Sequence, residues 1–174
     1  MLYTAAGPEI AVASTKAYTT QLSVFYLVVA KMALLRGVYT EEQAKSFIAE
    51  LERVPEVMQK VLEKRRDIHV IAKKILEAKD LFMIGRGLDY SILLEGSLKL
   101  KEVSYIHSEA YASGELKHGP IALITTNTPV VATVTQEKLM SKELSNIKEV
   151  NPEVQILYYL SKRNFPVILI PNIR

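Results

Sequence analysis

The chain has 174 residues, enough for one domain or slightly more, and almost half of them are hydrophobic, so it can bury a substantial core. Its formal net charge of +3 comes from interspersed basic and acidic residues, without the basic block typical of nucleic-acid-binding proteins. The absence of cysteine excludes disulfides and thiolate chemistry, and it is consistent with a reducing compartment. The longest apolar run, Leu22 to Ala30, is far too short to span a bilayer, and no signal-peptide pattern precedes it. We therefore expect a cytoplasmic protein with no nucleic-acid partner and no membrane contact.

The first half of the sequence is typical of helices. Residues 1–8 are predicted to form a loop, and one long helix is predicted from Glu9 to about Arg36, where Gly37 ends it. Apolar residues cover several faces of this helix, which predicts packing on more than one side. Three shorter, charged and amphipathic helices are expected at about residues 41–53, 55–65 and 67–78.

The second half alternates between strand and helix patterns. Helices are predicted at residues 90–105 and 137–150, and strands at residues 80–84, 129–135 and 154–160, with a fourth expected at 166–170. The order strand, helix, strand, helix, strand indicates a parallel sheet with right-handed crossovers. The predicted fold class is therefore α/β, a doubly wound parallel sheet flanked by helices and preceded by a long helical segment.

Gly85-Arg86-Gly87 follows the first predicted strand and precedes a helix. In an open parallel sheet ligands bind at this edge, where backbone N–H groups can hold anionic or hydroxyl-rich ligands. The pattern lacks the third glycine of the dinucleotide fingerprint, and we expect no cofactor. A plain tight turn explains the motif equally well.

Glu95, Lys99 and Glu102 fall at i, i+4 and i+7 of the predicted helix, so they share a stripe roughly 60° wide. A base, a cation and a nearby imidazole are what an enzyme needs to move protons around a carbonyl. Ordinary surface ion pairs, worth about 0.2–0.5 kcal/mol each, explain the same spacing, and spacing alone favours them. The glycine turn at the start of the helix favours the catalytic interpretation, because it brings the first helical turns near any ligand bound there.

Two histidines, His107 and His118, follow this helix, and neither has a third ligand at a metal-site spacing, so no metal site is predicted. His118 is the better functional candidate because it lies in Gly114-Glu-Leu-Lys-His-Gly-Pro120, a loop with a defined path. An imidazole there can titrate near neutral pH and act as an acid or a base.

Three separated motifs carry a family resemblance. They are GPEIAVASTKAYTTQ at residues 7–21, LEGSLKLKEVSYIH at residues 94–107 and EAYASGELKHGP at residues 109–120. Together they resemble the isomerase half of the glutamine–fructose-6-phosphate aminotransferases (glucosamine-6-phosphate synthases), which consists of two sugar-isomerase (SIS) domains. The resemblance extends from residue 3 to about residue 150.

The resemblance implies a domain organisation. Residues 1–36 are expected to be the C-terminal helix of a first SIS domain, residues 37–79 a helical connector, and residues 80–174 a second, truncated SIS domain with a doubly wound sheet. It also implies a role in amino-sugar (UDP-GlcNAc and cell-wall) biosynthesis, in which fructose 6-phosphate and glutamine-derived ammonia give glucosamine 6-phosphate.

The resemblance also implies roles for single residues. Glu102 matches the glutamate that shuttles a proton between C1 and C2 of the sugar. Lys99 matches the lysine that lies one helical turn before that glutamate, and Glu95 matches a glutamate that supports the site. His118 matches the histidine that opens the sugar ring and reaches the neighbouring subunit, so a homodimer is expected. One carboxylate that removes and returns a proton, with groups that stabilise an enediol-like state, suits aldose–ketose isomerisation.

Val12 and Ser14 match positions that contact the sugar at the end of the first SIS domain. The family's phosphate-binding loop and its glutaminase domain are expected upstream of Met1, and its C-terminal lysine is expected in a tail beyond this chain. After about Val150 the sequence departs from the family pattern. The chain is therefore expected to be a fragment that is inactive alone.

Two alternatives remain open at this point. One is a non-catalytic SIS module that binds a sugar phosphate or regulates in response to it, against which the presence of Glu102 and His118 argues. The other is a related SIS deaminase or deglycase, which an upstream glutaminase domain would exclude.

Overall fold

A computed structural model describes residues 1–150, 157–161 and 168–169, and it divides the chain into two compact units, Met1–Lys74 and Ile75–Arg174. The first unit consists of helices: α1 Thr15–Leu35, α2 Glu41–Glu52, α3 Val54–Glu63 and α4 Arg65–Ile75, the last of which ends in the second unit. The predicted charged helices therefore lie within a few residues of their expected bounds.

The first helix begins later than predicted, at Thr15 rather than Glu9. The reason is that the preceding segment folds back across the helix start. Gly7 has a positive φ, the Lys16 ammonium donates to the carbonyl of Pro8, and the Glu9 carboxylate accepts the N–H of Ala17 at 3.2 Å. Glu9 thus binds one of the N–H groups that a helix start leaves without an intrahelical acceptor.

The turn between α1 and α2 is built from local signals that the sequence displays. Gly37 has the left-handed conformation that ends a helix, and Thr40 forms a reciprocal capping box with Gln43 at the start of α2. Phe47 of α2 then packs against the rings of Tyr26 and Tyr39 at centroid distances of 6.1 and 6.3 Å. These contacts join α1 to α2.

The α1 helix has the length and apolar composition of a membrane-crossing helix, among the residues that the structure describes. The apolar run from Leu22 to Ala30 is only part of this 21-residue helix, so the shortness of that run does not argue against a membrane span. A core helix of a soluble protein passes the same test.

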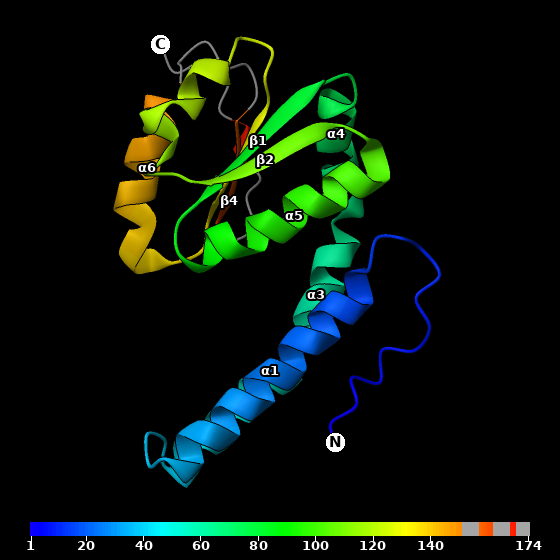
Figure 1. Cartoon of the computed structure of the whole chain (residues 1–174), viewed down its shortest axis with the longest axis vertical. Coiled ribbons are helices and arrows are strands. Elements are labelled where there is room, and N and C mark those ends of the chain that lie inside the picture. Colours follow the sequence, from blue (N-terminus) through cyan, green and yellow to red (C-terminus); the bar gives the residue numbers. More distant parts are fainter. Residues whose placement is uncertain (151–156, 162–167, 170–174) are drawn as a thin grey trace. The chain divides into compact units, whose positions relative to one another are not determined.

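The second unit is a five-stranded sheet with helices around it (Figure 1). In chain order its elements are β1 Asp80–Gly85, α5 Leu88–Ser104, β2 His107–Ala112, η1 Leu116–His118, η2 Pro120–Leu123, β3 Val130–Val134, η3 Glu137–Leu139, α6 Met140–Glu149, β4 Leu157–Ser161 and β5 Ile168–Leu169. The order in the sheet is β2-β1-β3-β4-β5. The chain leaves β1 toward β2 and returns past β1 to form β3, which creates a topological switch point between β1 and β3.

Two features of the sheet differ from the sequence-based prediction. The edge strand β2 was not predicted, because His107-Ser-Glu-Ala-Tyr-Ala112 lacks the apolar run that marks the other strands. In addition, β1, β2, β3 and β4 pair in parallel, as predicted, whereas β5 pairs antiparallel to β4. The beginning of the predicted strand 154–160, the ends of 166–170 and most of the sequence that departs from the family after residue 150 lie outside the described residues.

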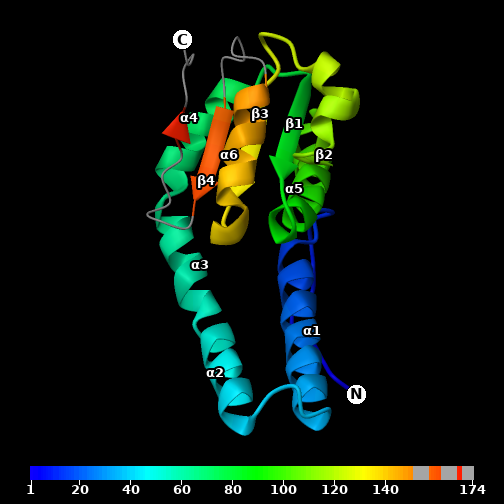
Figure 2. The same ribbon diagram turned by 90° about the vertical axis from the view of Figure 1, so that its left-hand side faces the viewer.

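The core lies in two layers on the faces of the sheet. Helices α5 and α6 cover different faces of the sheet (Figure 2). Leu81 and Met83 of β1 pack with Leu93 of α5, whereas Phe82 and Ile84 pack with Ile147 of α6. Glycine at position 85 permits the closest approach of β1 to α5, because a Cβ there would lie 3.0 Å from the backbone of α5.

Candidate functional site

Glu95, Lys99 and Glu102 form a contiguous ion-pair cluster on α5. The Lys99 Nζ atom lies 2.7 Å from Glu102 Oε2, to which it donates a hydrogen bond, and 3.4 Å from Glu95 Oε1. The helical spacing predicted from the sequence therefore does bring one ammonium between two carboxylates.

The burial of this cluster distinguishes it from a surface ion-pair ladder. The side chains of Glu95, Lys99 and Glu102 are 24%, 20% and 23% exposed, respectively. The pair Lys60–Glu56 on α3 has an equally short contact of 2.6 Å, but its side chains are 63% and 66% exposed. Partly desolvated charges interact more strongly than exposed ones, so the α5 cluster is unlike the ordinary helix-surface pairs of this chain.

The electrostatics of the cluster favour the charged forms. The hydrogen bond to Glu102 is the main cause that raises the pKa of Lys99 above its ordinary value of 10.5, with a further contribution from Glu95, and partial desolvation opposes both. Lys99 is therefore a permanent cation at neutral pH. A fixed positive charge beside a carboxylate holds that carboxylate in one place and stabilises negative charge that develops on a bound molecule.

The position of Glu102 on α5 separates it from the glycine turn. Glu102 lies about 21 Å along the helix from Leu88, at 1.5 Å per residue. Because α5 starts at the carboxyl end of β1 and returns to the start of the parallel strand β2, Glu102 lies at the opposite edge of the sheet. The glycine turn therefore lies beside the first turns of α5, as predicted for them, but not beside Glu102.

His118 lies at the carboxyl edge of the sheet, at the end of the short helix η1 that follows β2. Its side chain is 65% exposed, and its Nε2 atom lies 4.0 Å from the Glu115 carboxylate. His118 and Glu102 therefore occupy opposite edges of the same unit, and this chain does not bring them together in one site.

The other two predicted site residues, Val12 and Ser14, belong to the first unit. Val12 is exposed in the irregular segment before α1, and Ser14 occupies the N-cap position of that helix without a side-chain capping bond. Capping is instead supplied by Glu9. The Ser14 hydroxyl is thus not used to cap the helix.

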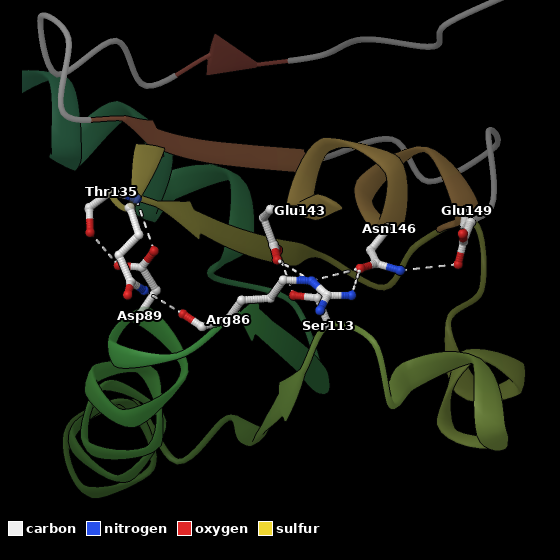
Figure 3. Close-up of polar contacts among 8 residues, drawn as sticks. Arg86, Asp89, Ser113, Thr135, Glu143, Asn146 and Glu149 are labelled. Atoms are coloured by element: carbon white, nitrogen blue, oxygen red, sulfur yellow. Dashed lines mark hydrogen bonds and ion pairs between the residues drawn. The ribbon is translucent and has the colours of Figure 1, made fainter. Parts of the chain in front are cut away.

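Arg86, at the switch point, reaches across the carboxyl edge of the sheet into a polar network (Figure 3). Its guanidinium donates two hydrogen bonds to Asn146 Oδ1, at 2.5 and 3.1 Å, and its Nε atom lies 3.6 Å from Glu143 Oε2. The other carboxylate oxygen of Glu143 accepts the hydroxyl hydrogen of Ser113 at 2.5 Å. The network thus joins the end of β1, the end of β2 and helix α6.

A second set of contacts closes the Gly85–Gly87 turn. The buried Asp89 carboxylate accepts the backbone N–H of Thr135 at 2.9 Å and also its hydroxyl hydrogen, while Gln136 Nε2 donates to the carbonyl of Arg86. These contacts cross from β1 to the residues after β3, where a ligand binds in many doubly wound folds. The interpretation of this motif as a tight turn is favoured, because the Arg86 side chain and the carbonyls of Arg86 and Gly87 are bonded within the chain.

Sequence reasoning did not find Glu143, whose side chain is only 1% exposed. Burial is the main cause that raises its pKa above the ordinary value of 4.5, although Ser113 and Arg86 act in the opposite direction. A signal was present in the sequence. Glu143 falls on the same helical stripe as Met140 and Ile147, where a carboxylate interrupts an apolar face. Within the described residues, no group of three or more histidines and acids is arranged to hold a metal ion.

Comparison with known proteins places the sheet unit in a family. Residues 74–170, more than half of the chain, match the family model of the SIS domain. The chain belongs to the SIS domain family. The SIS-type fold class and the resemblance predicted from the sequence are thereby confirmed.

Several proteins similar to this SIS chain are named as aminotransferases. The glutamine–fructose-6-phosphate aminotransferases (isomerizing) of Caldanaerobacter subterraneus subsp. tengcongensis and Clostridium tetani are 53% and 54% identical to it over 150 residues, which is 86% of this chain and 25% of each relative. The C-terminal domain of glucosamine-fructose-6-phosphate aminotransferase from Francisella tularensis superimposes with a TM-score of 0.81 at 44% identity, covering 89% of this chain and 43% of that one. The SIS chain thus spans about a quarter of the length of the curated relatives that it matches.

Proposed function

We propose that this SIS chain is part of the isomerase half of an enzyme that converts fructose 6-phosphate and glutamine-derived ammonia into glucosamine 6-phosphate for amino-sugar biosynthesis. The observation that carries the proposal is the partly buried cluster on α5, in which Lys99 lies between Glu95 and Glu102. The names of the relatives, together with 53% and 54% identity over 150 residues, support the choice of substrate.

In the proposed mechanism, Glu102 takes a proton from C1 of the open-chain sugar derivative and returns it to C2. A single carboxylate suits this transfer, because it can act first as the base and then as the acid. Lys99, which donates a hydrogen bond to Glu102 at 2.7 Å, orients the carboxylate and stabilises the enediol-like charge. Glu95 holds the other side of the ammonium and supports the site.

Substrate binding and ring opening are assigned to the remaining residues. His118 acts as the acid–base group that opens the sugar ring, and Val12 and Ser14 contact the sugar. Because Glu102 and His118 lie at opposite edges of one unit, we propose that His118 serves the site of a second copy, which makes the working form a homodimer. The separation of about 21 Å between Glu102 and the start of α5 supports this arrangement.

The proposal extends to the setting of the protein. A glutaminase domain supplies ammonia, no cofactor takes part, and the enzyme works in the cytoplasm without nucleic acid or membrane. The absence of cysteine supports a reducing compartment. The contacts of α1 with α2 support a role of its apolar face in protein packing.

Replacement of Glu102 tests the function directly. A chimera is made in which the 150 matched residues of this SIS chain replace the corresponding segment of the Caldanaerobacter relative. Glu102→Gln in this chimera keeps the size and hydrogen-bonding capacity of the side chain but removes the base. We expect glucosamine 6-phosphate formation to fall by about 10²–10⁴-fold, the usual range for loss of an acid–base group.

The matched control is Glu56→Gln, which removes the carboxylate of the exposed ion pair with Lys60 and leaves the rate unchanged. Unaltered activity of the Glu102→Gln chimera would contradict the proposed role. A chimera that binds fructose 6-phosphate but forms no product even with Glu102 in place would identify a sugar-phosphate binding module instead.

A further inference from the structure

The loop that carries His118 follows the edge strand of the sheet. It leaves the edge strand β2 at Ala112, and His118 itself is largely exposed. Two buried residues anchor the path between them. Leu116 inserts into the core, and Ser113 donates its backbone N–H to the carbonyl of Gly85 at 3.0 Å and its hydroxyl hydrogen to Glu143 at 2.5 Å.

The buried carboxylate of Glu143 is costly to the fold. Among the residues that the structure describes, no donor binds its Oε2 atom, and its ion-pair partner Arg86 lies at 3.6 Å. A buried ion pair of this kind often stabilises a protein less than apolar side chains of the same size. The role of Glu143 is therefore to fix the position of the groups that it binds. Here the carboxylate holds the hydroxyl of Ser113, five residues before His118.

Arg86 fixes the same loop from the other side. Its guanidinium, held by Asn146, lies so close to Gly114 that a Cβ on that glycine would be 2.8 Å from Nη2. Gly114 has no positive φ, so the backbone there accepts any residue and only the guanidinium restricts the side chain. Arg86, Glu143 and Ser113 thus confine the chain at the point where it turns from β2 into the His118 loop.

We infer that Arg86, Glu143 and Ser113 are positioning residues that set the place of the His118 imidazole, acting through residues 113–118. The inference rests on the proposed function for the role of His118 in ring opening. In many doubly wound folds the carboxyl edge of the sheet binds the ligand. Here, according to this inference, the same edge supports a catalytic loop instead. None of the three residues needs to touch the sugar.

The first test is amide hydrogen exchange in the 174-residue chain. Glu143→Gln keeps an acceptor for the Ser113 hydroxyl but removes the charge that faces Arg86, and Gly114→Ala displaces the guanidinium. Each is expected to speed exchange at residues 115–118 by roughly tenfold, the equivalent of exchanging a charge-assisted hydrogen bond for a neutral one. Exchange in β1 and α5 is expected not to speed up in either variant. The control is Gly96→Ala, whose new Cβ meets only Met83 Sδ at 3.7 Å and leaves the loop unchanged. Unchanged exchange at residues 115–118 in both test variants would overturn the inference.

The second test separates positioning from general damage. In the chimera, Glu143→Gln is assayed with fructose 6-phosphate and with an analogue in which hydrogen replaces the C5 hydroxyl, so that the ring cannot close. We expect turnover of the cyclic sugar to fall by about 10²-fold, as for a misplaced catalytic group, and turnover of the open-chain analogue to stay within about twofold. Equal losses on both sugars, or no loss on either, would overturn the inference.

The two tests fail independently of the proposed function. If the unsubstituted chimera turns over neither sugar, the proposed function fails, and the exchange experiment alone decides whether Glu143 and Arg86 hold the loop. If the unsubstituted chimera is active and exchange at residues 115–118 is unaffected by both substitutions, the proposed function stands and the positioning role is overturned.

Discussion

Glu102 and His118 lie at opposite edges of the unit that carries them both. Glu102 is near the C-terminal end of α5, beside the start of β2, whereas His118 follows the other end of that strand. If one site uses both residues, as proposed above, they come from two copies of the chain. This relationship makes the subunit arrangement testable without a structure of the assembly.

Mixed oligomers provide that test. Chimeras carrying Glu102→Gln and His118→Gln are each expected to be nearly inactive, but a dimer with one chain of each kind contains one site with both groups intact. Random mixing yields such dimers half of the time, so we expect recovery of about one quarter of the unsubstituted activity. Subunit exchange followed by a glucosamine 6-phosphate assay measures it. A mixture as inactive as its components would contradict a site shared between copies.

Lys99 is expected to titrate above its ordinary pKa of 10.5, because the Glu102 carboxylate stabilises the ammonium. The stabilisation is complete below the ordinary pKa and disappears as the pH rises through the raised value, where the folded protein loses the charge. NMR of the Lys99 side chain, followed upward in pH, measures the midpoint. In Glu102→Gln the midpoint should move down toward the ordinary value of 10.5, and a midpoint that does not move would exclude Glu102 as the main cause.

Glu143 is expected to oppose folding at neutral pH, because burial raises its pKa in the folded state. At a pH below the ordinary value of 4.5 both the folded and the unfolded chain are protonated at this residue, and the residue contributes nothing to pH dependence. As the pH rises above 4.5, the unfolded chain releases the proton more readily, so unfolding becomes easier. The free energy of unfolding of Glu143→Gln relative to the unsubstituted chain should therefore increase with pH.

Urea denaturation of the two chains at about pH 4 and about pH 8 measures this difference. A difference that falls with rising pH would contradict the raised pKa. Combined with faster exchange in the His118 loop, a gain in global stability would show that the carboxylate serves the loop at the expense of the fold.

Two threonines of the second unit offer a matched pair for hydrogen-bond energetics. The buried hydroxyl of Thr133 has no hydrogen-bond partner in the described part of the chain, whereas the hydroxyl oxygen of Thr128 accepts the N–H of Thr125 at 3.1 Å. We expect Thr133→Val to raise the free energy of unfolding by about 1 kcal/mol and Thr128→Val to lower it by a similar amount. Thermal or urea denaturation gives both values, and equal changes of the same sign would contradict the assignment.

The parts of the fold that were predicted correctly depend on local patterns. The apolar runs of β1 and β3, the turn at Gly37 and the start of α2 at residue 41 all depend on a few neighbouring residues, and each lies where the sequence predicted it. Strand β2 was missed because an edge strand need not be apolar: its pairing with β1 supplies the hydrogen bonds, and that pairing is distant in sequence. The start of α1 was misplaced for a similar reason, because Glu9 caps the helix from outside it.

The candidate site divides in the same way. The ion-pair cluster on α5 follows from spacing within one helix, so Glu95, Lys99 and Glu102 were found together. The network around Arg86 joins residues 57 and 60 positions apart, 86 to 143 and 86 to 146, and no short motif records such a distance. Only the interruption of the apolar stripe on α6 by Glu143 pointed to it.

The polar contacts of Arg86 at the carboxyl edge of the sheet have a consequence for inhibitor discovery. A compound that enters beside the Gly85–Gly87 turn would meet Arg86 and its partners rather than a sugar site. By separating the guanidinium from Glu143 it would release the loop that carries His118. Such a compound would need a carboxylate or a similar group to bind Arg86, but it need not resemble a sugar phosphate. Its inhibition would then be non-competitive with the substrate.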